Sequence, residues 1–237
     1  MCQLLGVISN MPVDIRLSLM EFRHRGEKNP HGWGFAFPEN GEWNIIKQPA
    51  PLNEEDTGDR RFSFKSRITI GHVRLASCGK HTRPNTHPFS LNKWAFVHNG
   101  TVTGIMHNPD FSLNHYHPHG ETDSEYALYR LVEAIEEEPG NEEKVIARES
   151  EKIRKHGRFN FILSDGEKLY AHGDDSLYYV ERKAPFQTVT LRDDGYSVHL
   201  NEIKLSSERA VIVATEPLTK EENWQKFEGL MVFKPGD

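Results

Sequence analysis

The chain has 237 residues, enough to bury a sizeable core, and its 36% hydrophobic and 27% charged residues are typical of a soluble globular protein. A net charge of −6 argues against a surface that binds nucleic acid or an anionic membrane. Since no apolar run is long enough to span a membrane and no basic stretch precedes the first apolar residues, we expect a cytoplasmic protein without a signal peptide.

The first half of the chain predicts strands interrupted by one helix. The strands are expected at residues 3–10, 33–37, 43–46, 67–76 and 94–98. Residues 14–24 carry apolar side chains at helical spacing, and Arg25–Gly26 is expected to end this helix. Asn40–Gly41 predicts a tight hairpin turn, whereas the charged segment 53–61 predicts a loop.

The second half predicts two helices followed by strands. A loop over 107–120 leads into a helix that begins at Thr122 or Asp123, and residues 142–156 are expected to form another helix. Further strands are expected at residues 158–165, 168–172, 176–182, 196–200 and 209–218. This order favours sheets covered by outer helices, so we expect one α+β domain over residues 1–237.

Two cysteines, Cys2 and Cys78, are interpreted as reduced thiols, because a chain of this size needs no disulfide. No Cys-x-x-Cys or His-Glu-x-x-His spacing predicts a metal site. His115, His117 and His119 would share one face of an extended segment, but a solvated loop is the favoured interpretation. We therefore expect no bound metal and, since no glycine-rich phosphate loop is present, no cofactor.

Cys2 is the candidate nucleophile. If Met1 is removed, Cys2 carries both a thiol and a free α-amine, and the amine serves as the base that takes the thiol proton. An α-amine needs little tuning for this role, because roughly 10–15% of it is neutral at pH 7. A cysteine at position 2 is by itself usually incidental, so the assignment depends on the rest of the chain.

Three further positions carry polar groups near strand ends or a helix start. Arg74 could grip a carboxylate with two hydrogen bonds, although a salt-bridged surface arginine is the simpler alternative. Asn99 and Gly100 could offer a side-chain amide and a backbone N–H to an oxyanion, or they could form a hairpin turn. Asp123 could bind an ammonium group or only cap its helix.

Short motifs in a fixed order connect these positions. They are Cys2, Arg25–Gly26, Gly32–Gly34, Gly71–Arg74, Asn85–Pro88, His98–Gly100 and Gly120–Asp123. In this order they resemble the class II glutamine amidotransferases, which are N-terminal-nucleophile hydrolases. The later segments Leu163–Gly166 and Ala214–Leu218 are similar to the stand-alone branch of that family.

The resemblance implies a four-layer αββα sandwich of the α+β class, with the nucleophile at the start of the first strand. It implies that Cys2 attacks the γ-amide carbon of glutamine while Asn99 and Gly100 hold the oxyanion, and that water then hydrolyses the γ-glutamyl thioester. Arg74 would bind the substrate α-carboxylate and Asp123 its α-ammonium group. The other implied substrate-site residues are Arg25 and Gly26, which shape the pocket, Ser77, and His87, which braces the Arg74 loop.

Two departures from the family pattern concern the far end of the substrate. Relatives that supply ammonia to a fused synthase often have Trp-Ala-Thr-His after the arginine, where this chain has Leu75–Cys78. Ser77 keeps a hydroxyl group, but the large aromatic residue is absent. His31 stands where stand-alone relatives often have an acidic residue.

The resemblance leaves the ammonia acceptor and the true substrate open. We expect the glutaminase-like domain to account for all 237 residues, so the ammonia would go to a separate synthase or to water. One alternative is a γ-glutamyl amide or peptide hydrolase of thiol metabolism. Another is a non-catalytic binding module on the same fold, which should have lost Cys2, Arg74 or Asp123. Retention of all three favours an enzyme that acts on glutamine.

Overall fold

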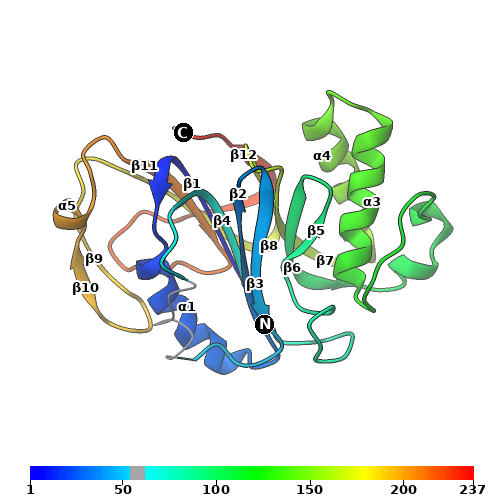
Figure 1. Cartoon of the computed structure of the whole chain (residues 1–237), viewed down its shortest axis with the longest axis horizontal. Coiled ribbons are helices and arrows are strands. Elements are labelled where there is room, and N and C mark those ends of the chain that lie inside the picture. The colour runs from blue at the N-terminus through cyan, green and yellow to red at the C-terminus, as the bar shows by residue number, and fades with distance from the viewer. Residues whose placement is uncertain (54–61) are drawn as a thin grey trace.

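The computed structural model describes residues 1–53 and 62–237, so most of the predicted loop over 53–61 lies outside the described residues. Its main strands are β1 (Gln3–Val13), β2 (Trp33–Glu39), β3 (Glu42–Gln48), β4 (Ser66–Val73), β5 (Phe89–Leu91), β6 (Trp94–Val102), β7 (Gly157–Ser164), β8 (Leu169–Lys183), β11 (Arg209–Ala214) and β12 (Gln225–Phe233). Neighbouring strands are hydrogen-bonded in the order β3-β2-β4-β1-β11-β8-β7-β6-β5, and β12 pairs with β8 (Figure 1).

The long strand β8 belongs to two sheets. Its first part, Leu169–His172, pairs with β7, and its last part, Tyr178–Lys183, pairs with β11. The first sheet therefore contains β3, β2, β4, β1, β11 and the end of β8, and the second sheet contains β5, β6, β7 and the start of β8. The two sheets are connected by continuous hydrogen bonding, because β8 runs from the second sheet into the first.

Asn160 of β7 holds the middle of β8. Its side-chain oxygen accepts hydrogen bonds from the backbone N–H groups of Asp174, Asp175 and Ser176 at 2.8, 3.1 and 3.2 Å. These three N–H groups do not pair with β7 or β11, so the buried Asn160 side chain supplies the acceptor that a neighbouring strand would otherwise provide. The sequence analysis predicted two strands here, at residues 168–172 and 176–182, and this prediction is wrong because β8 continues through the segment.

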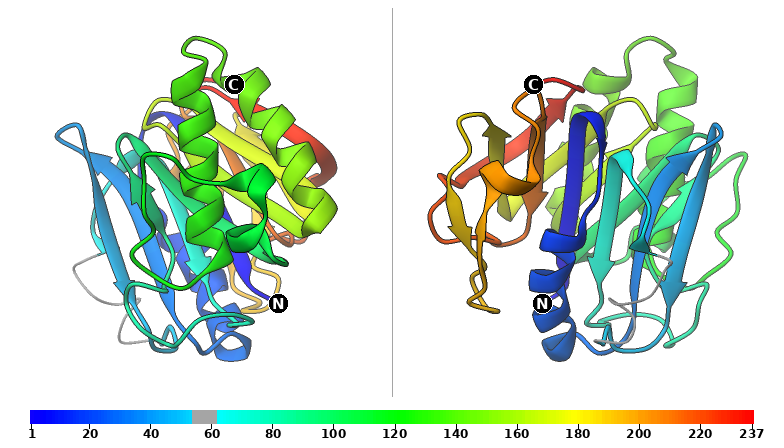
Figure 2. Two further views of the ribbon diagram at one scale, coloured as in Figure 1. Left: turned by 90° about the vertical axis from the view of Figure 1, so that its right-hand side faces the viewer. Right: turned by 60° about the vertical axis from the view of Figure 1, so that its left-hand side comes forward.

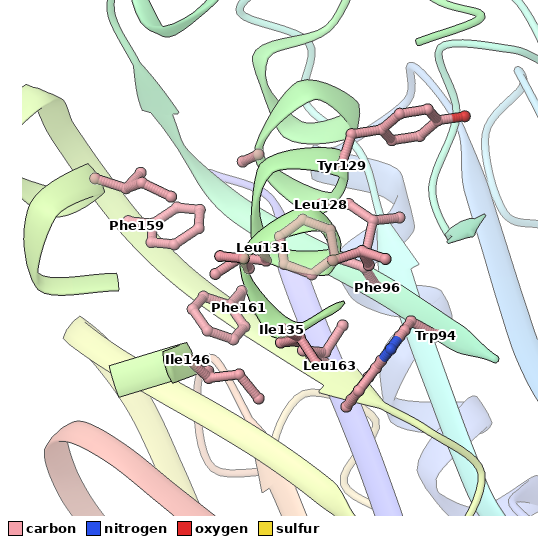
Figure 3. Close-up of a cluster of buried hydrophobic side chains, with 14 of the residues drawn as sticks. Trp94, Phe96, Leu128, Tyr129, Leu131, Ile135, Ile146, Phe159, Phe161 and Leu163 are labelled. Atoms are coloured by element: carbon pink, nitrogen blue, oxygen red, sulfur yellow. The ribbon is translucent and has the colours of Figure 1, made fainter. Parts of the chain in front are cut away.

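Three buried apolar clusters separate four layers. Helix α1 (Arg16–Lys28) packs Leu19 and Phe22 against the outer face of the first sheet. A second cluster, which includes Ile8 and Ile162, lies between the two sheets. Helices α3 (Asp123–Glu137) and α4 (Glu142–Ile153) cover the second sheet through a third cluster (Figure 3). This four-layer αββα sandwich confirms the predicted fold (Figures 1 and 2).

The spacing of apolar residues along α3 explains which face it buries. Leu128, Leu131, Val132 and Ile135 recur at helical intervals, and all are buried against the second sheet (Figure 3). The helix begins after Thr122, whose hydroxyl accepts a hydrogen bond from Glu125 N–H. The predicted helix is thus confirmed, with Thr122 as its cap.

The first helix ends later than the sequence predicts. The expectation that Arg25–Gly26 ends it is wrong, since α1 continues to Lys28. A Cβ atom on Gly26 would lie 2.9 Å from Leu52 Cβ, so glycine permits a close approach of the helix to this residue. By contrast, Asn40–Gly41 forms the predicted turn between β2 and β3, with φ values of 54° and 85°.

Smaller elements complete the described part of the chain. The 3-10 turns η2 (Ile105–His107) and η3 (Pro109–Phe111) lie at the start of the predicted loop, and η4 (Arg154–His156) follows α4. A two-stranded sheet of β9 (Thr188–Thr190) and β10 (Ser197–His199), with the short helix α5 (Leu200–Ile203), stands at one side of the sandwich (Figure 2). None of the described helices is long and apolar enough to cross a membrane.

Candidate active site

The Cys2 thiol lies immediately before β1, which pairs with β4 on one side and β11 on the other. Its Sγ accepts a hydrogen bond from Leu75 N–H at 3.2 Å and lies 3.3 Å from the Leu75 carbonyl oxygen. Burial raises the pKa of the Cys2 thiol above its ordinary value, although the nearby Arg74 guanidinium opposes part of this shift. The thiol is therefore protonated at neutral pH and needs a base to become a nucleophile.

Two adjoining cavities meet at Cys2 and share the segment Leu75–Ser77 and Gly100 as walls. The larger one, the outer cleft, has a volume of about 430 Å³ and is also lined by Met1, Asn99, Thr101 and Arg158. The smaller one, the inner recess, is also lined by Arg74, Cys78, His87, His98 and Thr122–Ser124. Segments far apart in sequence thus surround one thiol.

Arg74 follows the last residue of β4 and is only 3% exposed. Its guanidinium donates hydrogen bonds to the carbonyl oxygens of Cys78 at 2.7 Å, Lys80 at 3.2 Å and Gly79 at 3.4 Å. The alternative of a salt-bridged surface arginine is therefore wrong. These contacts fix the guanidinium in the wall of the inner recess, where its charge is shielded from water.

Asp123 is the first residue of α3, and its carboxylate is buried in the same recess. One oxygen accepts a hydrogen bond from Val102 N–H at 2.7 Å, and the other accepts one from Ser124 Oγ at 3.4 Å. Because Thr122 caps the helix, the alternative that Asp123 is its N-cap is wrong. Arg74 and Asp123 give the recess one basic and one acidic group.

Asn99 and Gly100 lie within β6, where they pair with Asn160 and Phe159 of β7. The alternative that they form a hairpin turn is therefore wrong. Asn99 Nδ2 is buried and has no hydrogen-bond partner among the described residues. Gly100 is required by the close approach of β7, since a Cβ atom there would overlap the Arg158 carbonyl oxygen.

His87 lines the inner recess and stacks on His72, with ring centroids 4.1 Å apart. Burial lowers the pKa of His72 to about 3 and holds the pKa of His87 well below its ordinary value, so both rings are neutral. The segment that carries His87 is fixed by Lys47, whose ammonium group donates to the Thr86 and Pro88 carbonyl oxygens at 2.7 and 3.0 Å. Burial lowers the pKa of Lys47 to about 8.

The loop that carries Ser77 is held on two sides. The Ser77 hydroxyl lies 2.9 Å from the Thr101 hydroxyl of β6, and His31 Nδ1 accepts a hydrogen bond from Ala76 N–H at 2.9 Å. His31 also stacks on His81, with ring centroids 4.1 Å apart. His31 therefore anchors the loop beside Cys2.

Arg25 and Gly26 lie outside both cavities. The Arg25 guanidinium donates to Gln3 Oε1 at 3.1 Å and to the Glu216 and Pro217 carbonyl oxygens at 3.0 and 2.7 Å. It therefore connects α1 to the residue after Cys2 and to the segment after β11. The contacts of Arg25 are therefore consistent with a role in holding the start of β1 in place, and not with contact to a substrate in either cavity.

A family model for class II glutamine amidotransferases matches residues 1–237. The chain belongs to the class II glutamine amidotransferases. YafJ of Escherichia coli, a provisionally named glutamine amidotransferase, is 34% identical over 242 residues, which cover 95% of this chain and 94% of YafJ. An uncharacterised protein of Methanocaldococcus jannaschii is 40% identical over 255 residues, covering all of this chain and 70% of that protein.

Solved structures agree with this membership. A crystal structure of a predicted glutamine amidotransferase from Pseudomonas aeruginosa has a TM-score of 0.72 and 29% identity, and the match covers 100% of this chain and 98% of that one. The glutamine phosphoribosylpyrophosphate amidotransferase of Bacillus subtilis has a TM-score of 0.60 at 14% identity, covering 98% of this chain and 49% of that one. At this identity the second likeness concerns the fold alone.

Within this amidotransferase, the structure brings together seven of the nine predicted site residues, namely Cys2, Arg74, Ser77, His87, Asn99, Gly100 and Asp123. The sequence analysis missed Thr101 and Arg158 in the outer cleft. Thr101 directly follows the Asn99–Gly100 motif, which was an available signal. Arg158 gave none, because only the pairing of β6 with β7 brings it to the cleft.

The metal alternative for the histidine-rich segment finds no support. His115, His117 and His119 are exposed on the loop before α3. In residues 1–53 and 62–237, no group of three or more histidine, cysteine or acidic side chains is arranged to hold a metal ion.

Proposed function

We propose that this amidotransferase is an amidase in which Cys2 attacks the γ-amide carbon of glutamine. The observation that carries the proposal is the unused donor beside the thiol: Asn99 Nδ2 is buried, and Asn99 and Cys2 line the same cleft. A buried donor without a partner costs about 1–3 kcal/mol. An oxyanion that forms next to Cys2 would satisfy this donor, and such stabilisation is often the largest catalytic contribution.

The Gly100 N–H is proposed as the second oxyanion donor. Val102 N–H turns away from β7, since it donates to the Asp123 carboxylate. N–H groups of alternate residues in a strand face the same edge, so we expect Gly100 N–H to face this edge as well. Strand β5 pairs with Trp94–Phe96 at the start of β6. The same edge of β6 beside Gly100 therefore has no neighbouring strand among the described residues.

The two charged groups of the inner recess are proposed to hold the amino-acid end of the substrate. Arg74 has five N–H donors, and its contacts with the three loop carbonyls leave one donor on Nε and one on Nη1, either of which could donate to a substrate carboxylate. Asp123 is proposed to accept hydrogen bonds from the α-ammonium group. Both side chains are already fixed by the protein, so little conformational entropy is lost when the substrate binds.

The base is proposed to be the α-amine of Cys2 after removal of Met1, which is 51% exposed and lines the outer cleft. The amine takes the thiol proton, the thiolate adds to the γ-carbonyl carbon, and the C–N bond breaks as the proton passes to ammonia. Water then hydrolyses the γ-glutamyl thioester to glutamate and regenerates the thiol. Without removal of Met1 the nitrogen of Cys2 is an amide and cannot act as a base.

The fate of the amine product defines two versions of this function. In the first, ammonia passes to a separate synthase or to water, and glutamine is the substrate. In the second, the leaving amine is larger and hydrolysis of a γ-glutamyl amide or peptide is the purpose of the reaction. The volume of the outer cleft, about 430 Å³ beside the thiol, supports the second version.

Ammonia release from glutamine, measured together with the intact mass of the same sample, tests the proposal. We expect a mass that lacks Met1 and equal amounts of glutamate and ammonia. Cys2→Ala should abolish the release, whereas Cys78→Ala, which removes the other thiol of the recess, should retain most of it. Full activity in Cys2→Ala, or glutamine binding without turnover in the wild type, would contradict an amidase.

A further inference from the structure

The outer cleft is larger than the release of ammonia requires. Ammonia is about the size of a water molecule, for which on the order of 15 Å³ of such space suffices. The cleft holds about 430 Å³, which is within the range of about 300–1,000 Å³ typical of small-molecule sites. The inner recess has a volume of only about 20 Å³, so the outer cleft would hold part of the γ-glutamyl group as well as a leaving group larger than ammonia.

Arg158 is the one charged side chain among the residues that line the outer cleft. Its Nε lies 2.8 Å from Asp175 Oδ2, and its side chain is 41% exposed. The two terminal nitrogens have no hydrogen-bond partner among the residues that the structure describes. This edge of the guanidinium can therefore receive a planar anion with two parallel hydrogen bonds, while Asp175 holds the other edge.

The strand register places this cation on the same face of the sheet as the proposed oxyanion donor Asn99. Arg158 is directly opposite Thr101, and Asn99 is two residues before Thr101 on β6. Alternate residues of a strand and their cross-strand partners share one face, so Asn99, Thr101 and Arg158 point toward the same layer. An acyl oxygen held at Asn99 would leave the departing amine close to Thr101 and Arg158, away from the inner recess.

We propose that the outer cleft is a subsite for an amine leaving group that carries a carboxylate, and that Arg158 binds this carboxylate. The substrate class is then a γ-glutamyl amide of an amino acid. The inference rests on the proposed amidase chemistry of Cys2. The C–N bond breaks, the proton from the thiol passes to the leaving nitrogen, and water completes the hydrolysis, so the products are glutamate and a free amino acid.

A comparison of three substrates separates the contribution of Arg158 from that of the Cys2 attack on the γ-amide, which all three share. Glutamine has no leaving-group carboxylate, γ-glutamylglycine has one, and γ-glutamylglycinamide is its neutral analogue of similar size. In the wild type we expect kcat/KM for γ-glutamylglycine to exceed that for the glycinamide by about tenfold or more, as hydrogen bonds to a charged group predict. Arg158→Gln should remove this preference by lowering kcat/KM for γ-glutamylglycine far more than it lowers the value for glutamine or for the glycinamide.

Arg154→Gln is the matched control. Arg154 is 40% exposed and forms an ion pair with Asp174 at 2.9 Å, yet it does not line the outer cleft. This variant removes the same charge from a neighbouring position, so it should keep the preference for γ-glutamylglycine. Arg158→Lys keeps a charge but loses the planar fork, and it should retain only part of the preference.

The outcomes distinguish the subsite from the underlying chemistry. Wild-type turnover of glutamine with no preference for γ-glutamylglycine over its amide would overturn the subsite and leave the amidase intact. If Arg158→Gln lowered kcat/KM equally for all three substrates, Arg158 would act by positioning β6. That result would also overturn the subsite. Inactivity of the wild type on every γ-glutamyl compound would overturn the proposed function, and the subsite with it.

Discussion

Leu75 holds Cys2 through both of its backbone polar groups, with Leu75 N–H and the Leu75 carbonyl oxygen 3.2 and 3.3 Å from Cys2 Sγ. Leu75 directly follows Arg74, so the backbone that positions the thiol is continuous with the residue proposed to bind the substrate carboxylate. A substitution that moves the backbone at Arg74 is therefore expected to displace the thiol as well. This coupling makes the loop after β4 part of the catalytic geometry.

The oxyanion role of Asn99 predicts a loss of rate with little change in stability. Asn99→Ala should lower kcat for glutamine hydrolysis by about 10²–10³ and leave KM nearly unchanged, because the interaction forms only as the oxyanion develops. Since Asn99 Nδ2 has no hydrogen-bond partner among the described residues, the free energy of unfolding should not fall by more than about 1 kcal/mol. Steady-state kinetics and urea unfolding check the two parts. A large loss of stability with unchanged kcat would assign Asn99 a structural role instead.

Arg74→Lys should raise KM for glutamine by about tenfold or more, because a point ammonium charge cannot replace a planar guanidinium. The lysine would also lose contacts with the loop carbonyls, so the melting temperature should be measured alongside the kinetics. A glutamine analogue that lacks the α-carboxylate provides the control, since its KM should be the same in both proteins. An unchanged KM for glutamine would show that the carboxylate is bound elsewhere.

Asn160→Ala should destabilise the protein by about 2–4 kcal/mol, because three backbone N–H groups of β8 lose their acceptor together. Urea unfolding at constant pH measures this change. Asn160→Asp keeps an acceptor for these N–H groups but loses the Nδ2 donor to Asp175 Oδ1, so the stability it recovers should be greatest at acidic pH, where the two carboxyl groups can share a proton. A loss below about 0.5 kcal/mol in the alanine variant would mean that β8 keeps its path without this side chain.

The buried His72 predicts loss of stability in acid. Burial lowers its pKa in the folded state to about 3, whereas an unfolded histidine has a pKa near 6.5. Between these values the unfolded chain binds a proton that the folded chain excludes, so stability is fully present above pH 6.5 and falls as pH decreases toward 3. The contribution is about 1.4 kcal/mol per pH unit over much of that range.

His72→Leu tests this contribution by removing the titrating ring. Unfolding free energies at several pH values between 7.5 and 4.5 should then fall less steeply in the variant than in the wild type. His87 is also buried and its pKa is also lowered, so a residual slope is expected in the variant. Parallel slopes in the two proteins would contradict a neutral, buried His72.

Local patterns in the sequence predicted the elements whose structure depends on nearby residues. The apolar spacing along α3 and the Asn40–Gly41 turn are of this kind, and both are confirmed. The ordered motifs also predicted the family and most residues around Cys2. In each case the necessary information lies within one short segment or in the order of several.

Features that depend on pairing between distant segments escaped prediction. The continuity of β8 depends on Asn160 of another strand, and Arg158 enters the cleft only because β7 pairs with β6. Gly26 was interpreted as a helix end because its close contact with Leu52 cannot be read from the adjacent sequence. β12 was not predicted as a strand, and its pairing with β8 likewise joins segments distant in sequence.

The crossing of β8 between the two layers has a consequence for when the chain becomes reactive. Cys2 and Arg74 flank β1 and β4 of the first sheet, whereas Asn99 and Gly100 lie within β6 of the second. A partly folded chain with one sheet formed would have the thiol without the proposed oxyanion donors, or the donors without the thiol. Catalytic power would thus appear only when the sandwich closes, and during denaturation it should be lost no later than the layers separate.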